Sequence, residues 1–100
     1  MSEPNQPPAG NQPTVSIKID DEELKGRYAN LLRITHTREE FVLDFINLAA
    51  PQGIVTARIV TSPGHLKRTL RALELNLRRY EEAFGEIHEA PPPAGSDRVN

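Results

Sequence analysis

The sequence predicts an α+β protein in which an antiparallel four-stranded β-meander precedes one long C-terminal α-helix. Three observations lead to this fold class. Four short segments have the composition of strands, short connections join them, and apolar residues then recur at helical spacing over about five turns. Short connections favour antiparallel pairing, because a parallel crossover needs roughly a dozen or more residues.

The four segments predicted to form strands are residues 15–19, 28–37, 41–46 and 54–61. In the first, valine and isoleucine alternate with polar residues, the period-two pattern of a half-buried strand. The second alternates in the same way, and the fourth is rich in β-branched residues, which favour strands. The third is mostly apolar on both faces, which predicts a central strand with a helix on one side and a partner on the other.

A long amphipathic helix is expected to follow the strands. Ser62 and Pro63 mark its start, because a serine side chain accepts hydrogen bonds from free helical N–H groups and proline fits the first helical position. Gly85 is expected to end it in a left-handed conformation. Its apolar residues are spaced alternately four and three apart and form a seam for dimerisation or packing: Leu66, Leu70, Leu73, Leu77, Tyr80 and Phe84. Two alternatives stay open, because the seam can pack on the sheet of its own chain or on the helix of a second copy.

Composition divides the 100-residue chain into one domain and two tails. Residues 1–13 contain four prolines and no large apolar residue after the initiator methionine, which predicts a disordered tail. Residues 88–100 contain three consecutive prolines and predict a second disordered tail. A single α+β domain is therefore expected over residues 14–87.

The small size of this domain bears on its oligomeric state. A domain of this size buries only about 60% of the surface that its unfolded chain exposes, so self-association is a common source of stability and a homodimer is expected.

The chain has no cysteine, which excludes disulfides and thiolate metal sites, and no cofactor is expected. It has neither a signal-peptide pattern nor an apolar run of membrane-spanning length, so we expect a cytoplasmic protein that does not bind membranes.

Asp44 stands out because it is a carboxylate on a face that should be apolar. An unpaired buried charge is costly. Asp44 is therefore expected to form a structural ion pair with Arg58 on the following strand or with Arg33 on the preceding one.

Residues that could support catalysis or metal binding are few. The three histidines lack the close spacing of a metal site, and Ser62 is better explained as a helix cap than as a nucleophile. The helix carries a candidate basic face formed by Lys67, Arg68 and Arg71, but Glu74 interrupts it and no aromatic residue lies among its members for base stacking. These patterns predict a protein that is not an enzyme, and they favour a solvated helix surface over a nucleic-acid site.

Several separated motifs resemble a family of small bacterial proteins known only as a domain of unknown function. The motifs are Tyr28-Ala29-Asn30, Glu40 to Phe45, Arg58 to Lys67, Asn76, Tyr80-Glu81 and Phe84-Gly85. The resemblance implies a bacterial protein and no particular activity. It also implies that Asp44, Arg58 and the Ser-Pro start of the helix belong to a shared scaffold.

The order of four meandering strands and one long helix is also similar to the core unit of the SecB-type export chaperones. The leading hypothesis is a non-enzymatic homodimeric module that binds another protein through its sheet or helix surface. One alternative is a SecB-like holdase chaperone that binds unfolded polypeptides on its apolar sheet surface. The other is a nucleic-acid-binding protein that uses the basic helix face.

Overall fold

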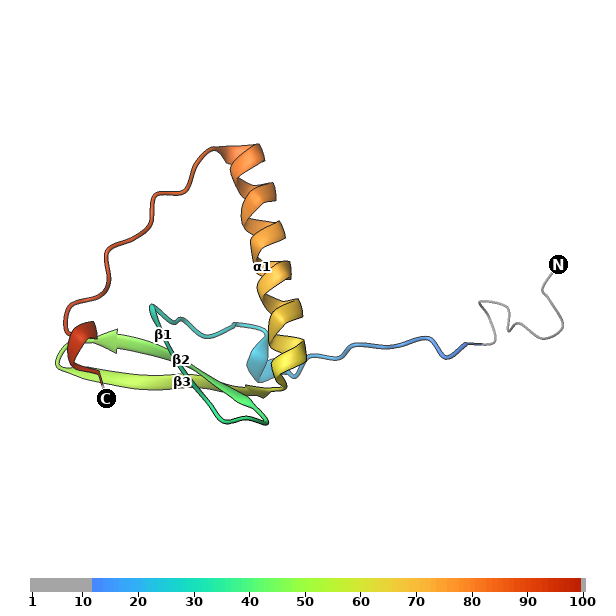
Figure 1. Ribbon diagram of the computed structural model, residues 1–100, viewed down its shortest axis with the longest axis horizontal. Coiled ribbons are helices and arrows are strands. Elements are labelled where there is room, and N and C mark those ends of the chain that lie inside the picture. Colours follow the sequence, from blue (N-terminus) through green and yellow to red (C-terminus); the bar gives the residue numbers. More distant parts are fainter. Residues whose placement is uncertain (1–11, 100) are drawn as a thin grey trace, which may run out of the picture.

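The computed structural model describes residues 12–99 as a small sheet, a long helix and two short 3-10 turns (Figure 1). The elements follow one another as η2 (Asp21–Glu23), β1 (Leu31–His36), β2 (Phe41–Ala49), β3 (Gln52–Thr61), α1 (Pro63–Phe84) and η3 (Ser96–Arg98). This is an α+β fold with one antiparallel sheet and one long helix, as predicted. The predicted tail over residues 1–13 lies almost entirely outside the described residues.

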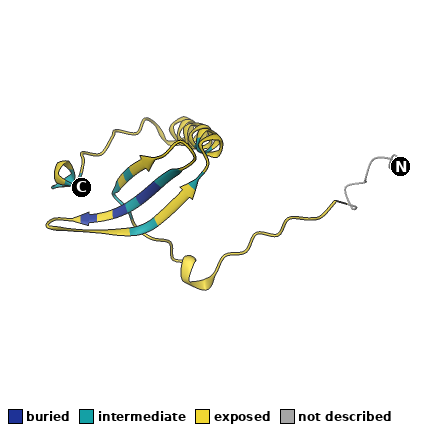
Figure 2. Ribbon diagram, turned by 60° about the horizontal axis from the view of Figure 1, so that its bottom comes forward, coloured by how far each residue is buried: buried dark blue, intermediate teal, exposed yellow. Residues whose placement is uncertain are grey.

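The sheet has the strand order β1-β2-β3, so β2 is the central strand, as its two apolar faces predict. β1 pairs with β2 without a shift in register. The pairing of β2 with β3 shifts between Phe45 and Ile46, because Thr56 forms a bulge in β3. The apolar core is small: among the described residues, Leu43, Ile46 and Leu48 of β2 are the buried apolar side chains (Figure 2).

The prediction of four strands is wrong, because the sheet in the described part of the chain has three. Residues 15–19, predicted as the first strand, run as an exposed segment away from the sheet (Figure 1). Alternation identifies the side chains that would share a face, but a strand also needs a neighbour for its backbone hydrogen bonds. In the described part of the chain this segment has no strand beside it, and the SecB-like topology, which needs the fourth strand, is not confirmed.

Helix α1 starts at the residues that the sequence predicts. The Oγ atom of Ser62 accepts a hydrogen bond from the backbone N–H of His65 at 3.1 Å, and Pro63 is the first helical residue. At the other end Gly85 has a φ of 99°, which favours glycine, and its N–H donates to the carbonyl of Glu81 at 2.8 Å. The N-terminal half of α1 lies beside the sheet and the C-terminal half projects away from it (Figure 1).

The two faces of the sheet have different neighbours. The helix-side face carries Ile34 and Leu43, which are paired across β1 and β2, and lies next to α1. The opposite face carries Asp44 and Ile46, and the C-terminal segment returns to it so that η3 lies beside the β2–β3 hairpin (Figures 1 and 2).

The domain boundaries at residues 14 and 87 stay a prediction. Within residues 12–99, α1 is too polar to qualify as a bilayer-spanning helix and the other helical segments are too short.

Candidate functional site

An apolar groove with a cavity volume of about 550 Å³ runs between the helix-side face of the sheet and the N-terminal half of α1. β1 and β2 form its floor, and α1 forms its wall. Its lining residues are Leu32, Ile34, Phe41, Leu43, Pro63, Leu66, Lys67, Thr69, Leu70 and Leu73. Only Lys67 and Thr69 carry polar side chains, so the groove offers apolar contact area and few partners for hydrogen bonds.

The apolar seam predicted for the helix continues out of this groove along α1. Its first three members line the groove, and its last three, Leu77, Tyr80 and Phe84, lie beyond it. The rings of Tyr80 and Phe84 contact each other, with their centroids 5.0 Å apart. Leu73 is 59% exposed and Phe84 is 77% exposed, and no residue of α1 is buried (Figure 2). The six residues therefore form one stripe, and the chain itself leaves most of that stripe uncovered.

On the opposite face of the sheet, Asp44 lies between two arginines. The register pairs Asp44 with Arg33 of β1 on one side and with Arg58 of β3 on the other. Arg58 donates from Nε to Oδ1 at 2.7 Å and from Nη2 to Oδ2 at 2.9 Å, and Arg33 donates from Nη2 to Oδ2 at 3.1 Å. Asp44 is 3% exposed. The structure thus brings together both arginines that the sequence offers as partners of this carboxylate.

This cluster changes the acidity of Asp44. The hydrogen bonds from Arg58 contribute most, and those from Arg33 and the two positive charges act in the same direction; burial of the carboxylate opposes them, and the pKa of Asp44 falls to about 2. Asp44 in turn raises the pKa of Arg58 above its ordinary value, chiefly through the same hydrogen bonds. A carboxylate held ionised between two guanidinium groups suits a structural role and is a poor general base.

Sequence reasoning missed the role of Asn30, which lies just before β1. Its backbone N–H donates to the carbonyl of Ile46 at 3.0 Å. Its side-chain amide donates from Nδ2 to the carbonyl of Leu48 at 2.9 Å and accepts at Oδ1 from the N–H of Leu48 at 2.8 Å. Asn30 therefore supplies Leu48 with the two hydrogen bonds that another strand residue would give. Its place in the Tyr28-Ala29-Asn30 motif was the only sequence signal for it.

Replacing Asn30 with alanine is expected to lower the free energy of unfolding by about 1–3 kcal/mol, because it leaves the N–H and carbonyl of buried Leu48 without partners. Chemical denaturation measures this change. The matched control is Asn76→Ala on α1, where the side-chain amide donates only to the carbonyl of Ala72 in its own helix. The control should change stability by less than about 0.5 kcal/mol. Equal effects of the two substitutions would contradict the role assigned to Asn30.

The candidate basic residues Lys67, Arg68 and Arg71 are exposed on α1. Lys67 borders the groove, and Nη2 of Arg68 lies 2.9 Å from Nδ1 of His65. At about 100° per residue, Arg71 and Arg68 lie on the side of the helix that faces away from the apolar seam. Lys67 thus lies at the edge of the groove, whereas Arg68 and Arg71 lie on the solvated side of α1, and the three residues do not line one common cavity.

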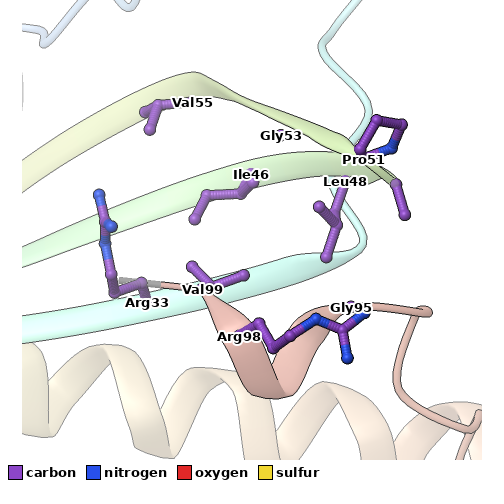
Figure 3. Close-up of a pocket in the computed structure, with 10 residues that line it drawn as sticks. Arg33, Ile46, Leu48, Pro51, Gly53, Val55, Gly95, Arg98 and Val99 are labelled. Carbon is purple, nitrogen blue, oxygen red and sulfur yellow. The ribbon is translucent and has the colours of Figure 1, made fainter.

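A second cavity of about 520 Å³ lies on the opposite face of the sheet, beneath the C-terminal segment (Figure 3). Ile46, Leu48 and Val55 line it from the sheet, and Val99 lines it from the C-terminal segment. Two guanidinium groups border it: Arg33 donates to Asp44, and Arg98 lies 3.7 Å from the carboxylate of Asp97. Its lining contains no nucleophile beside a base, and residues of the C-terminal segment form one of its sides.

The fold and these contacts define a small α+β protein with an uncovered apolar surface and a structural ion-pair cluster. Within residues 12–99, no group of three or more His, Cys, Asp or Glu residues is placed to hold a metal ion. The family model described as "Protein of unknown function (DUF3467)" matches residues 1–89, and the chain belongs to this family. No curated protein and no solved structure gave a significant match.

Proposed function

We propose that this chain is a non-enzymatic protein-interaction module that forms a homodimer through α1 and the groove beside it. The observation that carries the proposal is the apolar seam of α1, which its own sheet covers only in part. In the proposed dimer, the seam of one copy packs against the seam and groove of the other. The outer surface of the paired copies is then available to another protein.

The energetics support a partner for this seam. A single amphipathic helix has little stability in water without tertiary packing. Fully burying a large apolar side chain contributes about 1.5–3 kcal/mol. The five seam residues from Leu70 to Phe84 are each at least half exposed in the single chain. Covering them therefore contributes on the order of 5 kcal/mol for each copy.

The spacing of the seam supports an antiparallel arrangement of two α1 helices. Its six members are distributed symmetrically about Leu75, so a two-fold axis there matches each member with another. The resulting layers are Leu66 with Phe84, Leu70 with Tyr80, and Leu73 with Leu77. In this arrangement the projecting C-terminal half of each helix lies against the groove of the other copy, where the apolar floor of β1 and β2 is open.

Charges beside the seam agree with the antiparallel arrangement. Lys67 near one end of the helix and Glu81 near the other lie on the same side of the seam, so antiparallel packing places each Lys67 near Glu81 of the second copy. Glu74 lies near the two-fold axis and meets its own counterpart. That contact is exposed and costs only a few tenths of a kcal/mol, roughly the size of an exposed helix pair. A parallel pair brings no oppositely charged residues together beside the seam.

Light scattering over a dilution series tests the proposal. We expect twice the mass of the chain at micromolar concentration and partial dissociation on dilution, because the seam is the main source of contact area. Circular dichroism on the same samples should show helix content falling as the dimer dissociates. A monomer that keeps its full helix content at every concentration would contradict the proposal.

A holdase chaperone is the second candidate function, and the open apolar groove is the observation that favours it. In that case an unfolded polypeptide, and not a second copy, occupies the groove. Suppression of a client protein's thermal aggregation measures this activity. A monomeric chain that suppresses aggregation would support the holdase, whereas a dimer without effect at a molar excess would exclude it.

A further inference from the structure

The segment of residues 14–20 has the pattern of a strand but pairs with no strand within residues 12–99. Val15 is 83% exposed and Ile17 is 92% exposed, and both alternate with the polar residues Ser16 and Lys18. This alternation suits a segment that buries one face, because valine and isoleucine favour the pleated, half-buried surface of a sheet. In a segment surrounded by solvent, the alternation of apolar and polar residues buries no face.

The sheet has two edges, and they differ in their ability to accept another strand. The edge strand β3 contains the bulge at Thr56, and a bulge interrupts a ladder and turns an edge away from new partners. The edge strand β1 pairs regularly with β2 along its length. On its helix-side face, Leu32 is 44% exposed and Ile34 is 49% exposed. A strand added beside β1 would place apolar side chains next to both of them and extend the floor of the groove.

We infer that residues 14–20 of one copy add to the outer edge of β1 in a second copy as an antiparallel strand, so that each copy acquires a four-stranded sheet. This inference rests on the proposed homodimer, since the strand comes from the second copy. The exchange is reciprocal, as two-fold symmetry requires. The exchange explains why the sequence predicts four strands whereas the sheet of the single chain has three.

Charge and apolar pairing together select the register of the added strand. Residues directly opposite each other in an antiparallel pair share a face, and like charges there are destabilising. Placing Ile17 opposite Leu32 puts Ser16 opposite Arg33. A shift by two residues would instead put Lys18 opposite Arg33. A shift by two residues in the other direction would put Val15 opposite Leu32 and Ile17 opposite Asn30. The first register is favoured over both, because it avoids the like-charge pair and puts Val15 opposite Ile34 and Ile17 opposite Leu32 on the helix-side face.

Cross-linking tests the exchange, and the absence of native cysteines allows single-cysteine variants to be used. The inferred register places Thr14 opposite Thr35, and both are exposed. Full-length Thr14→Cys and Thr35→Cys chains are mixed, equilibrated and treated with a short bismaleimide. The mixed product should form about tenfold more than with Gln52→Cys in place of Thr35→Cys, because paired strands hold the thiols at a high effective concentration. Adding Ile17→Pro to the Thr14→Cys chain should reduce the yield to the control level, because proline removes a ladder hydrogen bond.

Light scattering on the same mixtures separates the two proposals. A dimer that gives no Thr14–Thr35 product above the control overturns the strand exchange and leaves the α1 dimer standing. A monomer overturns both. A chain carrying both Thr14→Cys and Thr35→Cys that cross-links only within itself shows that the strand adds to its own sheet, which also overturns the exchange.

Discussion

The double substitution Leu73→Lys with Leu77→Lys is expected to convert the proposed dimer into a monomer at micromolar concentration. These residues form the central layers of the proposed antiparallel pair, and each is more than half exposed in the single chain. Covering the exposed half of a leucine contributes about 0.75–1.5 kcal/mol, so the four side chains in a dimer contribute about 3–6 kcal/mol. The Kd should therefore rise by roughly a hundredfold to ten-thousandfold. Sedimentation equilibrium measures the change, and the helix content should fall with it.

A matched pair of single substitutions separates loss of the dimer from damage to the helix. Leu73→Lys lies in the seam, whereas Leu75→Lys lies about 160° around the helix from it. Both exchange an exposed leucine for lysine near the middle of α1. Leu73→Lys should weaken the dimer at least about tenfold, since it affects both copies, and Leu75→Lys should leave the Kd nearly unchanged. Equal weakening by both substitutions would show that the seam is not the dimer interface.

Asp44→Asn is expected to lower the thermal midpoint at neutral pH by several degrees and to have a smaller effect in acid. In the folded chain the pKa of Asp44 is about 2, and in the unfolded chain it returns to its ordinary value near 3.9. A carboxylate whose pKa is lower in the folded state stabilises the fold above the unfolded pKa, and this contribution is lost as the pH falls towards the folded pKa. The wild type should therefore lose its advantage over Asp44→Asn between about pH 4 and pH 2.

Thermal denaturation of both proteins from neutral to acid pH, at one protein concentration, measures the difference in Tm. Glu39→Gln is a suitable control, because it removes a carboxylate from the exposed turn between β1 and β2. The control should have a small effect on Tm throughout. An Asp44→Asn effect that is absent at neutral pH, or that is the same size at every pH, would contradict the structural role of the cluster.

Local patterns in the sequence were sufficient for most of the elements. The two apolar faces of residues 41–46 identified the central strand, and Ser62 with Pro63 identified the start of α1, because these signals depend on neighbours in the chain. The unusual position of Asp44 pointed to Arg33 and Arg58, since each lies on an adjacent strand of a meander. Asn30 could not be found in this way, because its hydrogen bonds to Leu48 depend on where β1 ends relative to β2.

Local sequence patterns were enough to show which segments are extended, where the long helix starts, which of its residues form an apolar stripe, and which charges must be paired. The packing of the elements in space established that residues 15–19 leave the sheet, that only the N-terminal half of α1 lies beside the sheet, and that the C-terminal segment returns to the opposite face. The physical reason is that amphipathicity and capping are properties of consecutive residues. Which surface covers an apolar face depends on the geometry of all the elements together, and here that geometry leaves the stripe on α1 open to a second molecule.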